Sequence, residues 1–167
     1  DPFVGKLSYF KVLSGTLQGD TKLINARTGE EEKLSKLLCL KGGKSEDIKS
    51  LSAGDIGAVA KLGDVLTGDT LSTKGKIAAS NVEFPAPTLS MAIYPKAKGD
   101  EEKIASSLNR LTEEDPTIIV KHNKETKELI LSALGEQHID VIKQKLKAKY
   151  GVDMALEEPI VPYRETI

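Results

Sequence analysis

Residues that could do acid–base, nucleophilic or metal chemistry are scarce in this chain, which has two histidines and one cysteine. His138 follows Glu136 and Gln137 just ahead of an amphipathic run, and the other histidine is His122. A zinc site would need carboxylates as further ligands, and the sequence has no His-x-x-x-His spacing. A nucleophilic pair would have to join Cys39 to a distant histidine, with no local signature around either residue. These residue types therefore predict neither a metal site nor a catalytic centre.

Two short motifs resemble nucleotide-binding loops, and each lacks a residue that the chemistry needs. The Gly43-Lys44-Ser45 stretch resembles the end of a phosphate-binding loop, but Leu38 stands where that loop requires a glycine. The NKET stretch, residues 123–126, resembles the guanine-reading Asn-Lys-x-Asp. Thr126 replaces the aspartate that would accept hydrogen bonds from the base. We therefore interpret the first as a chance match and the second as a hairpin turn.

His138 allows two interpretations. It stands at the predicted start of a helix, where a polar side chain can meet a partner or ligand beside backbone N–H groups that have no helical acceptor. Alternatively, it packs at that helix start and hydrogen-bonds locally. The residue pattern alone leaves both open.

The composition is that of an ordinary globular protein, with 39% hydrophobic and 29% charged residues. The 24 basic and 25 acidic side chains nearly cancel, so any contact with a polyanion would have to be local. A single cysteine allows no intrachain disulfide, which predicts a reducing compartment, the cytoplasm. No apolar run approaches the roughly 20 residues that cross a bilayer. The start at Asp1 without a methionine, and the end in PYRETI without a polar tail, predict a piece of a longer protein.

Residues 1–83 predict an antiparallel all-β barrel. Short apolar segments alternate there with turn residues, as in KLINA, RTGE, KLSKLLCL, SAGD, IGAVAKL and TGDTL. Closure into a barrel hides the strand edges. Arg27 in the RTGE turn, and Lys41 with Lys44 around the glycine turn, are cations on loops. Such cations suit contact with the phosphates of RNA.

Residues 84–88 predict a stiff linker, because Pro85 and Pro87 fix φ and bias the residues before them to extended conformations. Residues 89–167 then predict an α+β domain of the ferredoxin-like, split βαβ type, in the order β-α-β-β-α-β. Its first helix runs from Asp100 to a stop at the Asp-Pro pair 115–116. Two strands joined around residues 123–126 follow, then a helix capped by left-handed Gly151, and the strand VDMALEEP.

Six segments together resemble one protein family. They are DPFVGKLSYFKVLSGTL, AGDIGAVAKL, TGDTL, LNRLTEEDPTIIV, GEQH and PIVPYRETI. In this order they resemble the second and third domains of bacterial elongation factor G, the translocation GTPase of the ribosome. The resemblance covers essentially the whole chain, and it implies a translation-factor domain II barrel followed by the ferredoxin-like domain.

The resemblance also implies a function in protein synthesis. It implies that the barrel docks on small-subunit ribosomal RNA, with Arg27, Lys41 and Lys44 as the candidate contacts. It implies that the next domain lies by the switches of a GTP-binding domain and couples nucleotide state to movement. GTP and Mg would bind that other domain of the parent, so this chain is expected to have no cofactor, no catalytic residue and no GTPase activity of its own.

By position, three family segments map onto candidate residues that face the GTP-binding domain, in a groove where fusidic acid can lodge. These segments are the PxP connector, EDPT and GELH. The candidates are Pro85, Pro87, Asp115, Thr117, Gly135, Glu136, Gln137 and His138.

Three alternatives remain. Gln137 and Leu134 stand where the family usually has leucine and methionine, which leaves a paralogous ribosome-protecting or recycling GTPase open. A small acylphosphatase-like hydrolase is disfavoured, because no arginine lies in a glycine-rich loop to hold a phosphate. A free-standing oligonucleotide-binding module is disfavoured, because 4% aromatic residues without tryptophan offer few surfaces for base stacking.

Overall fold

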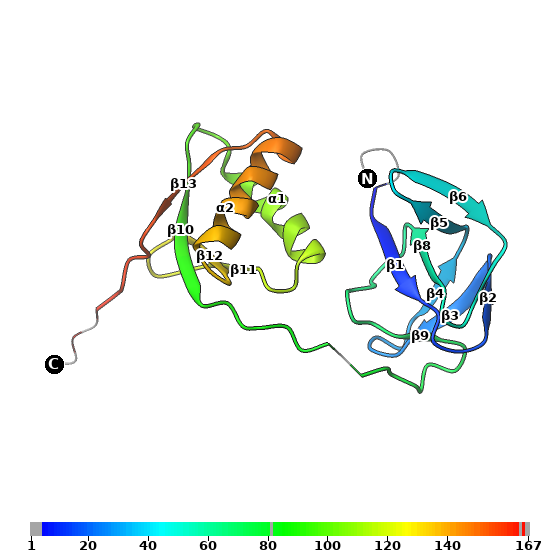
Figure 1. Ribbon diagram of the computed structural model, residues 1–167. Coiled ribbons are helices and arrows are strands. Elements are labelled where there is room, and N and C mark those ends of the chain that lie inside the picture. Colours follow the sequence, from blue (N-terminus) through cyan, green and yellow to red (C-terminus); the bar gives the residue numbers. More distant parts are fainter. Residues whose placement is uncertain (1–4, 81, 164, 166–167) are drawn as a thin grey trace. The chain divides into compact units, whose positions relative to one another are not determined.

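The computed structural model describes residues 5–80, 82–163 and 165 (Figure 1). Residues 1–4, which begin the first of the six segments, lie outside the described residues, as do Asn81 and, in the last segment, Arg164, Thr166 and Ile167. The chain divides into two compact units, Asp1–Val82 and Glu83–Ile167.

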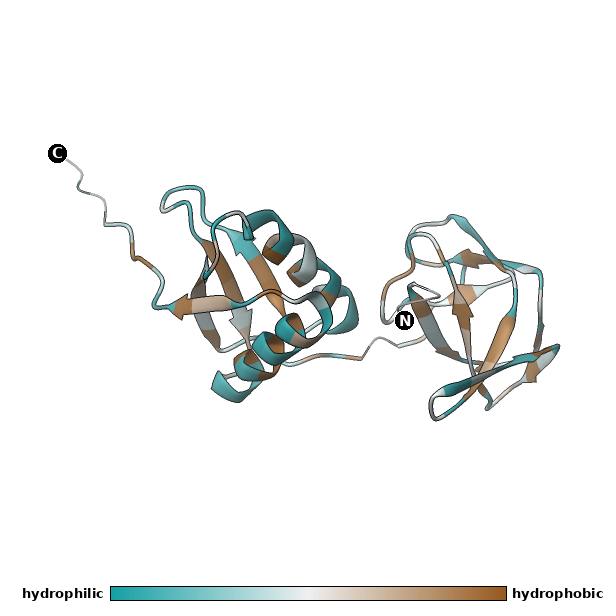
Figure 2. Ribbon diagram, turned by 90° about the horizontal axis from the view of Figure 1, so that it is seen from above, coloured by the Kyte–Doolittle hydropathy of each residue, from teal (hydrophilic) through white to brown (hydrophobic). Residues whose placement is uncertain are grey.

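The first unit is built from short antiparallel strands. They are β1 (Leu7–Lys11), β2 (Thr16–Gln18), β3 (Thr21–Asn25), β4 (Glu31–Leu34), β5 (Leu37–Lys41), β6 (Lys44–Ile48), β7 (Ser50–Ser52), β8 (Ile56–Ala60) and β9 (Leu71–Ser72). They form sheets in the orders β1-β8-β5-β6, β2-β7 and β4-β3-β9. The sheets share one apolar core, which includes Leu34, Leu37 and Val59, and Figure 2 shows apolar residues running along these strands. The prediction of an all-β barrel is confirmed.

The turn between β5 and β6 shows how glycine positions the candidate cations. Lys41 and Lys44 are directly paired across the ladder, so Gly42 and Gly43 alone reverse the chain. Gly42 has a φ of 61°, a left-handed conformation that glycine adopts without the penalty of a Cβ. The two lysines therefore stand side by side at the exposed tip of a hairpin.

The second unit has the predicted order β-α-β-β-α-β. Its elements are β10 (Leu89–Pro95), α1 (Glu101–Glu114), β11 (Ile119–His122), β12 (Leu129–Ala133), α2 (Glu136–Lys145), the π-helical turn η1 (Leu146–Tyr150) and β13 (Met154–Glu157). The strands form one antiparallel sheet in the order β11-β12-β10-β13. Both helices lie on one face of this sheet, over a core that includes Ile104, Leu108, Leu131, Ile142 and Met154 (Figure 1). The ferredoxin-like prediction is confirmed.

The helix ends follow from local chemistry. Asp115, at the end of α1, is extended with φ −133°, as expected of a residue that precedes proline. Gly151 is left-handed with φ 64°, so the predicted cap is confirmed. The π-helical turn before it was not predicted, because Leu146 stays buried in the widened turn and apolar spacing gives no sign of the change. Among the described residues, no helix is long and apolar enough to cross a membrane.

Candidate functional site

Residues from the EDPT and GEQH segments lie together in the second unit. Asp115 follows α1, and His138 lies in the first turn of α2. Nε2 of His138 is 3.1 Å from Oδ2 of Asp115, and the two side chains are 17% and 31% exposed. We call Asp115, Thr117, Leu134 and His138 the helix-start cluster. The fold thus joins residues that lie far apart in the sequence.

The other carboxylate oxygen of Asp115 is also occupied. Its Oδ1 accepts hydrogen bonds from the backbone N–H of Thr117 at 2.9 Å and from the Thr117 hydroxyl at 2.6 Å. Burial alone would raise the pKa of Asp115, but the hydrogen bonds from Thr117, and then the interactions with His138, outweigh it and lower the pKa. Asp115 is therefore held as a carboxylate that fixes the turn after α1.

The hydrogen bonds of His138 define its tautomer. The backbone N–H of Leu134 donates to Nδ1 at 3.3 Å, so Nδ1 is an acceptor without a proton. Nε2 then carries the proton and donates it to Asp115. Both ring nitrogens of His138 therefore have partners in the fold. Local hydrogen bonding, one of the two interpretations of His138, is what the structure shows.

The end of the linker reaches the same cluster. The Thr88 hydroxyl donates to the carbonyl of Leu134 at 2.7 Å, and the Thr88 N–H donates to the carbonyl of Ala133 at 3.0 Å. Leu134 is thus held through both its N–H and its C=O. Pro87 is half-buried and Pro85 is exposed, and neither makes a polar contact with the cluster. Sequence reasoning missed Thr88, and it named Leu134 only as a departure from the family pattern. Leu134 acts in the cluster through its backbone, so its residue type carries no signal of this role.

The surface over the start of α2 is a shallow hollow of about 470 Å³. Its lining residues are Leu134, Gly135, Glu136, Gln137 and His138. Because the N-cap is Gly135, no side chain caps the helix, and among the described residues the first-turn amides of α2 have no acceptor. The hollow therefore offers backbone donors beside the Leu134 side chain, which is 38% exposed.

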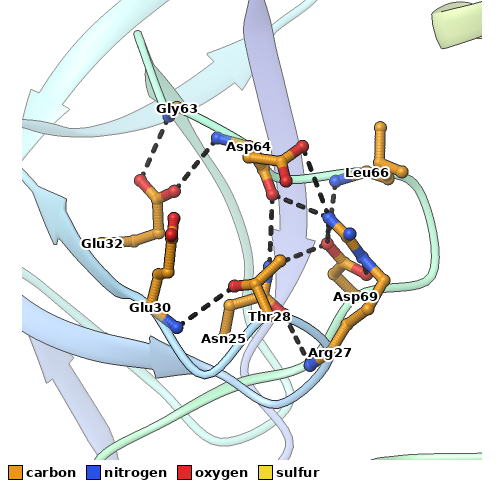
Figure 3. A network of polar contacts seen from close by, with 9 residues as sticks. All are labelled: Asn25, Arg27, Thr28, Glu30, Glu32, Gly63, Asp64, Leu66 and Asp69. Atoms are coloured by element: carbon orange, nitrogen blue, oxygen red, sulfur yellow. Dashed lines mark hydrogen bonds and ion pairs between the residues drawn. The ribbon is translucent and has the colours of Figure 1, made fainter.

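In the first unit, Arg27 is bound by acidic groups (Figure 3). Its Nε donates to Oδ1 of Asp69 at 2.8 Å, and its Nη2 donates to Oδ2 of Asp69 at 3.0 Å and to the Asp64 carbonyl at 2.8 Å. The hydrogen bond from Arg27 is the main reason that the pKa of Asp69 falls from 3.8 to about 2. Among the described residues, Nη1 is the guanidinium nitrogen that makes no hydrogen bond.

We call Asn25, Arg27, Glu32, Asp64 and Asp69 the barrel network. Asn25 is fully buried. Its Oδ1 accepts from the backbone N–H of Arg27 at 2.9 Å, and its Nδ2 donates to Oδ2 of Asp69 at 2.8 Å. The Glu32 carboxylate accepts from the backbone N–H groups of Gly63 at 3.1 Å and Asp64 at 3.2 Å. The network ties the loop between β8 and β9 to β3 and β4. Sequence reasoning missed Asn25 and Asp69, although both lie in quoted segments.

The two hairpin lysines differ in their partners. Lys41 pairs with Glu46 at 2.8 Å, where both side chains are more than half exposed, so the pair is weak and easily opened. The exposed Lys44 has no ion pair among the described residues. Lys44 is therefore the most available of the three candidate cations.

The other chemistry-bearing residues have ordinary surroundings. Lys44 and Ser45 lie in β6, after a hairpin turn and not before a helix, so the setting of a phosphate-binding loop is missing there. Residues 123–126 form the predicted turn, in which Oδ1 of Asn123 accepts from the Glu125 N–H at 3.0 Å. Cys39 is a free, half-buried thiol. Among the described residues, no three His, Cys, Asp or Glu side chains are grouped to hold a metal ion.

Comparison with known proteins supports the division into two units. A family model described as elongation factor G domain 2 matches residues 1–74, and one described as elongation factor G domain III matches residues 84–158. Together they leave out only residues 75–83 and 159–167. The chain belongs to the elongation factor G family. It comprises domains II and III of such a factor, as the resemblance of the six segments implied.

A solved structure agrees with this assignment. A crystal structure of a protein from Thermus thermophilus matches 98% of the chain at 28% sequence identity, with a TM-score of 0.82. The chain spans 25% of the length of that protein.

Proposed function

We propose that these two domains dock a translation factor of the elongation factor G type on the small ribosomal subunit, and that they couple the state of its GTPase switches to domain movement. The observation that carries the proposal is the match of domains II and III, in that order, along the chain. In this proposal the chain is a mechanical part: GTP and Mg bind a separate domain of the factor, and this chain hydrolyses nothing. The factor works in the cytoplasm, where the ribosomes are.

The barrel is the RNA-facing body in this proposal. Any attraction between the barrel and RNA must come from local groups of basic side chains, because the whole chain carries a net charge of −1. The β5–β6 hairpin supplies such a local group, since Lys44 has no carboxylate partner among the described residues and Lys41 has only the exposed Glu46. Phosphate contacts of this kind orient a protein on RNA without reading its sequence. Arg27 contributes through its remaining Nη1 while the barrel network holds its other donors.

The second unit faces the GTP-binding domain in this proposal. The helix-start cluster fixes the α1–β11 turn, the end of the linker and the start of α2 to one another. The hollow over Gly135 to His138 then meets its partner with a preformed surface. A preformed surface loses less binding free energy to the ordering of side chains. Such a surface can respond to ordered and disordered states of a switch segment.

Binding to purified small ribosomal subunits over a salt series tests the proposal. The affinity is expected to be saturable and to fall steeply between about 50 and 200 mM salt, because each phosphate contact releases counterions. Lys44→Ala should weaken binding and reduce the salt slope by about one. Lys22→Ala is the matched control, because Lys22 is an exposed barrel lysine that is already paired with Glu31 at 2.6 Å.

Two results would count against the proposal. Absence of saturable, salt-sensitive binding both by this chain and by the longer factor would remove ribosome docking altogether. Equal losses of affinity in Lys44→Ala and Lys22→Ala would show that the hairpin is not a specific contact and that only the overall charge of the barrel matters.

A further inference from the structure

Glu128 is a buried carboxylate that none of the roles above uses. It ends the turn between β11 and β12, where its carbonyl accepts from the Asn123 N–H at 2.8 Å, and the residue is only 4% exposed. Burial of an ionised carboxylate costs free energy unless donors surround it. The donors that surround Glu128 therefore show what the residue is placed to hold.

Two donors come from parts of the second unit that lie far apart in the sequence, one in its first strand and one after its last strand. The Tyr94 hydroxyl, on β10, donates to Oε1 of Glu128 at 2.8 Å. The backbone N–H of Ile160, beyond β13, donates to Oε2 at 3.2 Å and to Oε1 at 3.4 Å. The nearby Thr126 hydroxyl has the largest effect on the pKa of Glu128 and lowers it, although its geometry is not that of a hydrogen bond. Burial raises this pKa, but the hydrogen bonds from Tyr94 and Ile160 lower it further, so the net shift is downward. The carboxylate thus joins the β11–β12 turn, the central strand and the segment after the last strand.

That last segment has few other means of attachment. Residues 158–163 follow β13 without a strand partner, and Pro159 and Pro162 have no N–H to donate. Among the described residues, the Ile160 N–H, which both carboxylate oxygens of Glu128 share, is the one hydrogen-bond donor that ties this segment to the unit. The side chains of Ile160, Val161 and Tyr163 are 57%, 64% and 92% exposed, so apolar burial adds little. Figure 1 shows the segment leaving β13 beside the β11–β12 turn.

We propose that Glu128 is an anchor that fixes the direction in which residues 158–163 leave the second unit, and that loss of its charge releases this segment while the sheet stays folded. A hydrogen bond from an amide to a carboxylate is about twice as strong as one to a neutral acceptor. The anchor therefore holds a row of exposed apolar side chains in one place relative to the sheet.

Hydrogen exchange of the Ile160 amide, followed by NMR on the whole chain, tests this proposal. In Glu128→Ala the exchange of this amide should speed up by about tenfold or more, because its acceptor is gone. In Glu128→Gln the rise should be smaller, since the amide oxygen can accept from Ile160 while the Tyr94 hydroxyl turns to accept from the new NH₂ group. Glu158→Ala is the matched control, an exposed glutamate in the same segment, and should leave the Ile160 rate unchanged.

The amides of β10 and β12 show whether each variant is folded. Tyr94→Phe removes the other donor, and Ile160 should remain protected in it. An Ile160 amide that exchanges freely in the unaltered chain would overturn the proposal, as would an unchanged rate in Glu128→Gln. A rise in exchange throughout β10 and β12 together with Ile160 in both Glu128 variants would also overturn it, because the residue would then support the sheet and not the segment.

Discussion

The barrel network and the helix-start cluster both use one aspartate to hold a loop, but they hold different kinds of partner. In the first unit Asp69 binds the permanently charged guanidinium of Arg27. In the second unit Asp115 binds a histidine whose other ring nitrogen accepts a backbone N–H. The first arrangement is an ion pair, and the second depends on which nitrogen of His138 carries the proton.

The difference matters for function, because a residue that holds its own fold has fewer donors left for a partner. Arg27 was predicted as an RNA contact, and the barrel network takes its Nε and Nη2. Of the residues predicted from EDPT and GEQH, Asp115, Thr117 and His138 instead hydrogen-bond to one another beside the hollow over the start of α2. The two sets of candidates therefore call for different tests: the barrel network should govern stability, and the helix-start cluster should govern local geometry.

Asp69→Ala should have the largest effect on stability. It removes the acceptor of Arg27 and of the buried Asn25 side chain, and the Asp69 side chain is only 6% exposed. We expect the free energy of unfolding of the first unit to fall by about 3 kcal/mol, because partners are left unpaired. Urea denaturation measures this. Asp47→Ala, which breaks the exposed pair with Lys36, is the control and should cost under about 0.5 kcal/mol. Equal costs would mean that the barrel network is an ordinary surface feature.

Acidification should weaken the same ion pair, with a smaller effect. Since the folded pKa of Asp69 is lowered to about 2 from 3.8, its contribution is complete above the unfolded value and is lost as the pH falls through about 2. The difference corresponds to about 2 kcal/mol. The carboxyl ¹³C shift of Asp69 followed from about pH 5 to about pH 1.5 gives the midpoint. A midpoint near the unfolded value of 3.8 would show that Arg27 does not hold this carboxylate in solution.

Sequence patterns predicted the fold because both units rely on local periodicity. Alternation in strands such as β7 and helical spacing around Ile104 and Leu108 are fixed by which face must be buried. The order of elements in the second unit followed from these patterns and from Pro116 and Gly151. Neither pattern depends on a distant partner.

The candidate sites were less predictable, because their contacts join residues far apart in the sequence. Nothing near Arg27 indicates that Asp69 binds it, and the family resemblance brought Asp115 and His138 into one surface without indicating that they bond to each other. Thr88 and Leu134 take part partly or wholly through backbone groups, which every residue type shares. A sequence pattern contains only residue types, whereas these contacts depend on the path of the folded chain.

His138→Ala should have the smallest effect of the three, and it tests the geometry of the helix-start cluster directly. Asp115 would keep both hydrogen bonds from Thr117, and water can replace the histidine at the exposed Leu134, so we expect a loss of about 1 kcal/mol. His122→Ala is the matched control, since His122 is exposed on β11 and makes no side-chain hydrogen bond among the described residues. The ¹⁵N shifts of His138 should show a bare Nδ1 and a protonated Nε2 at neutral pH. A protonated Nδ1 in the neutral ring would break the bond from Leu134, and with it the claim that this cluster braces the start of α2.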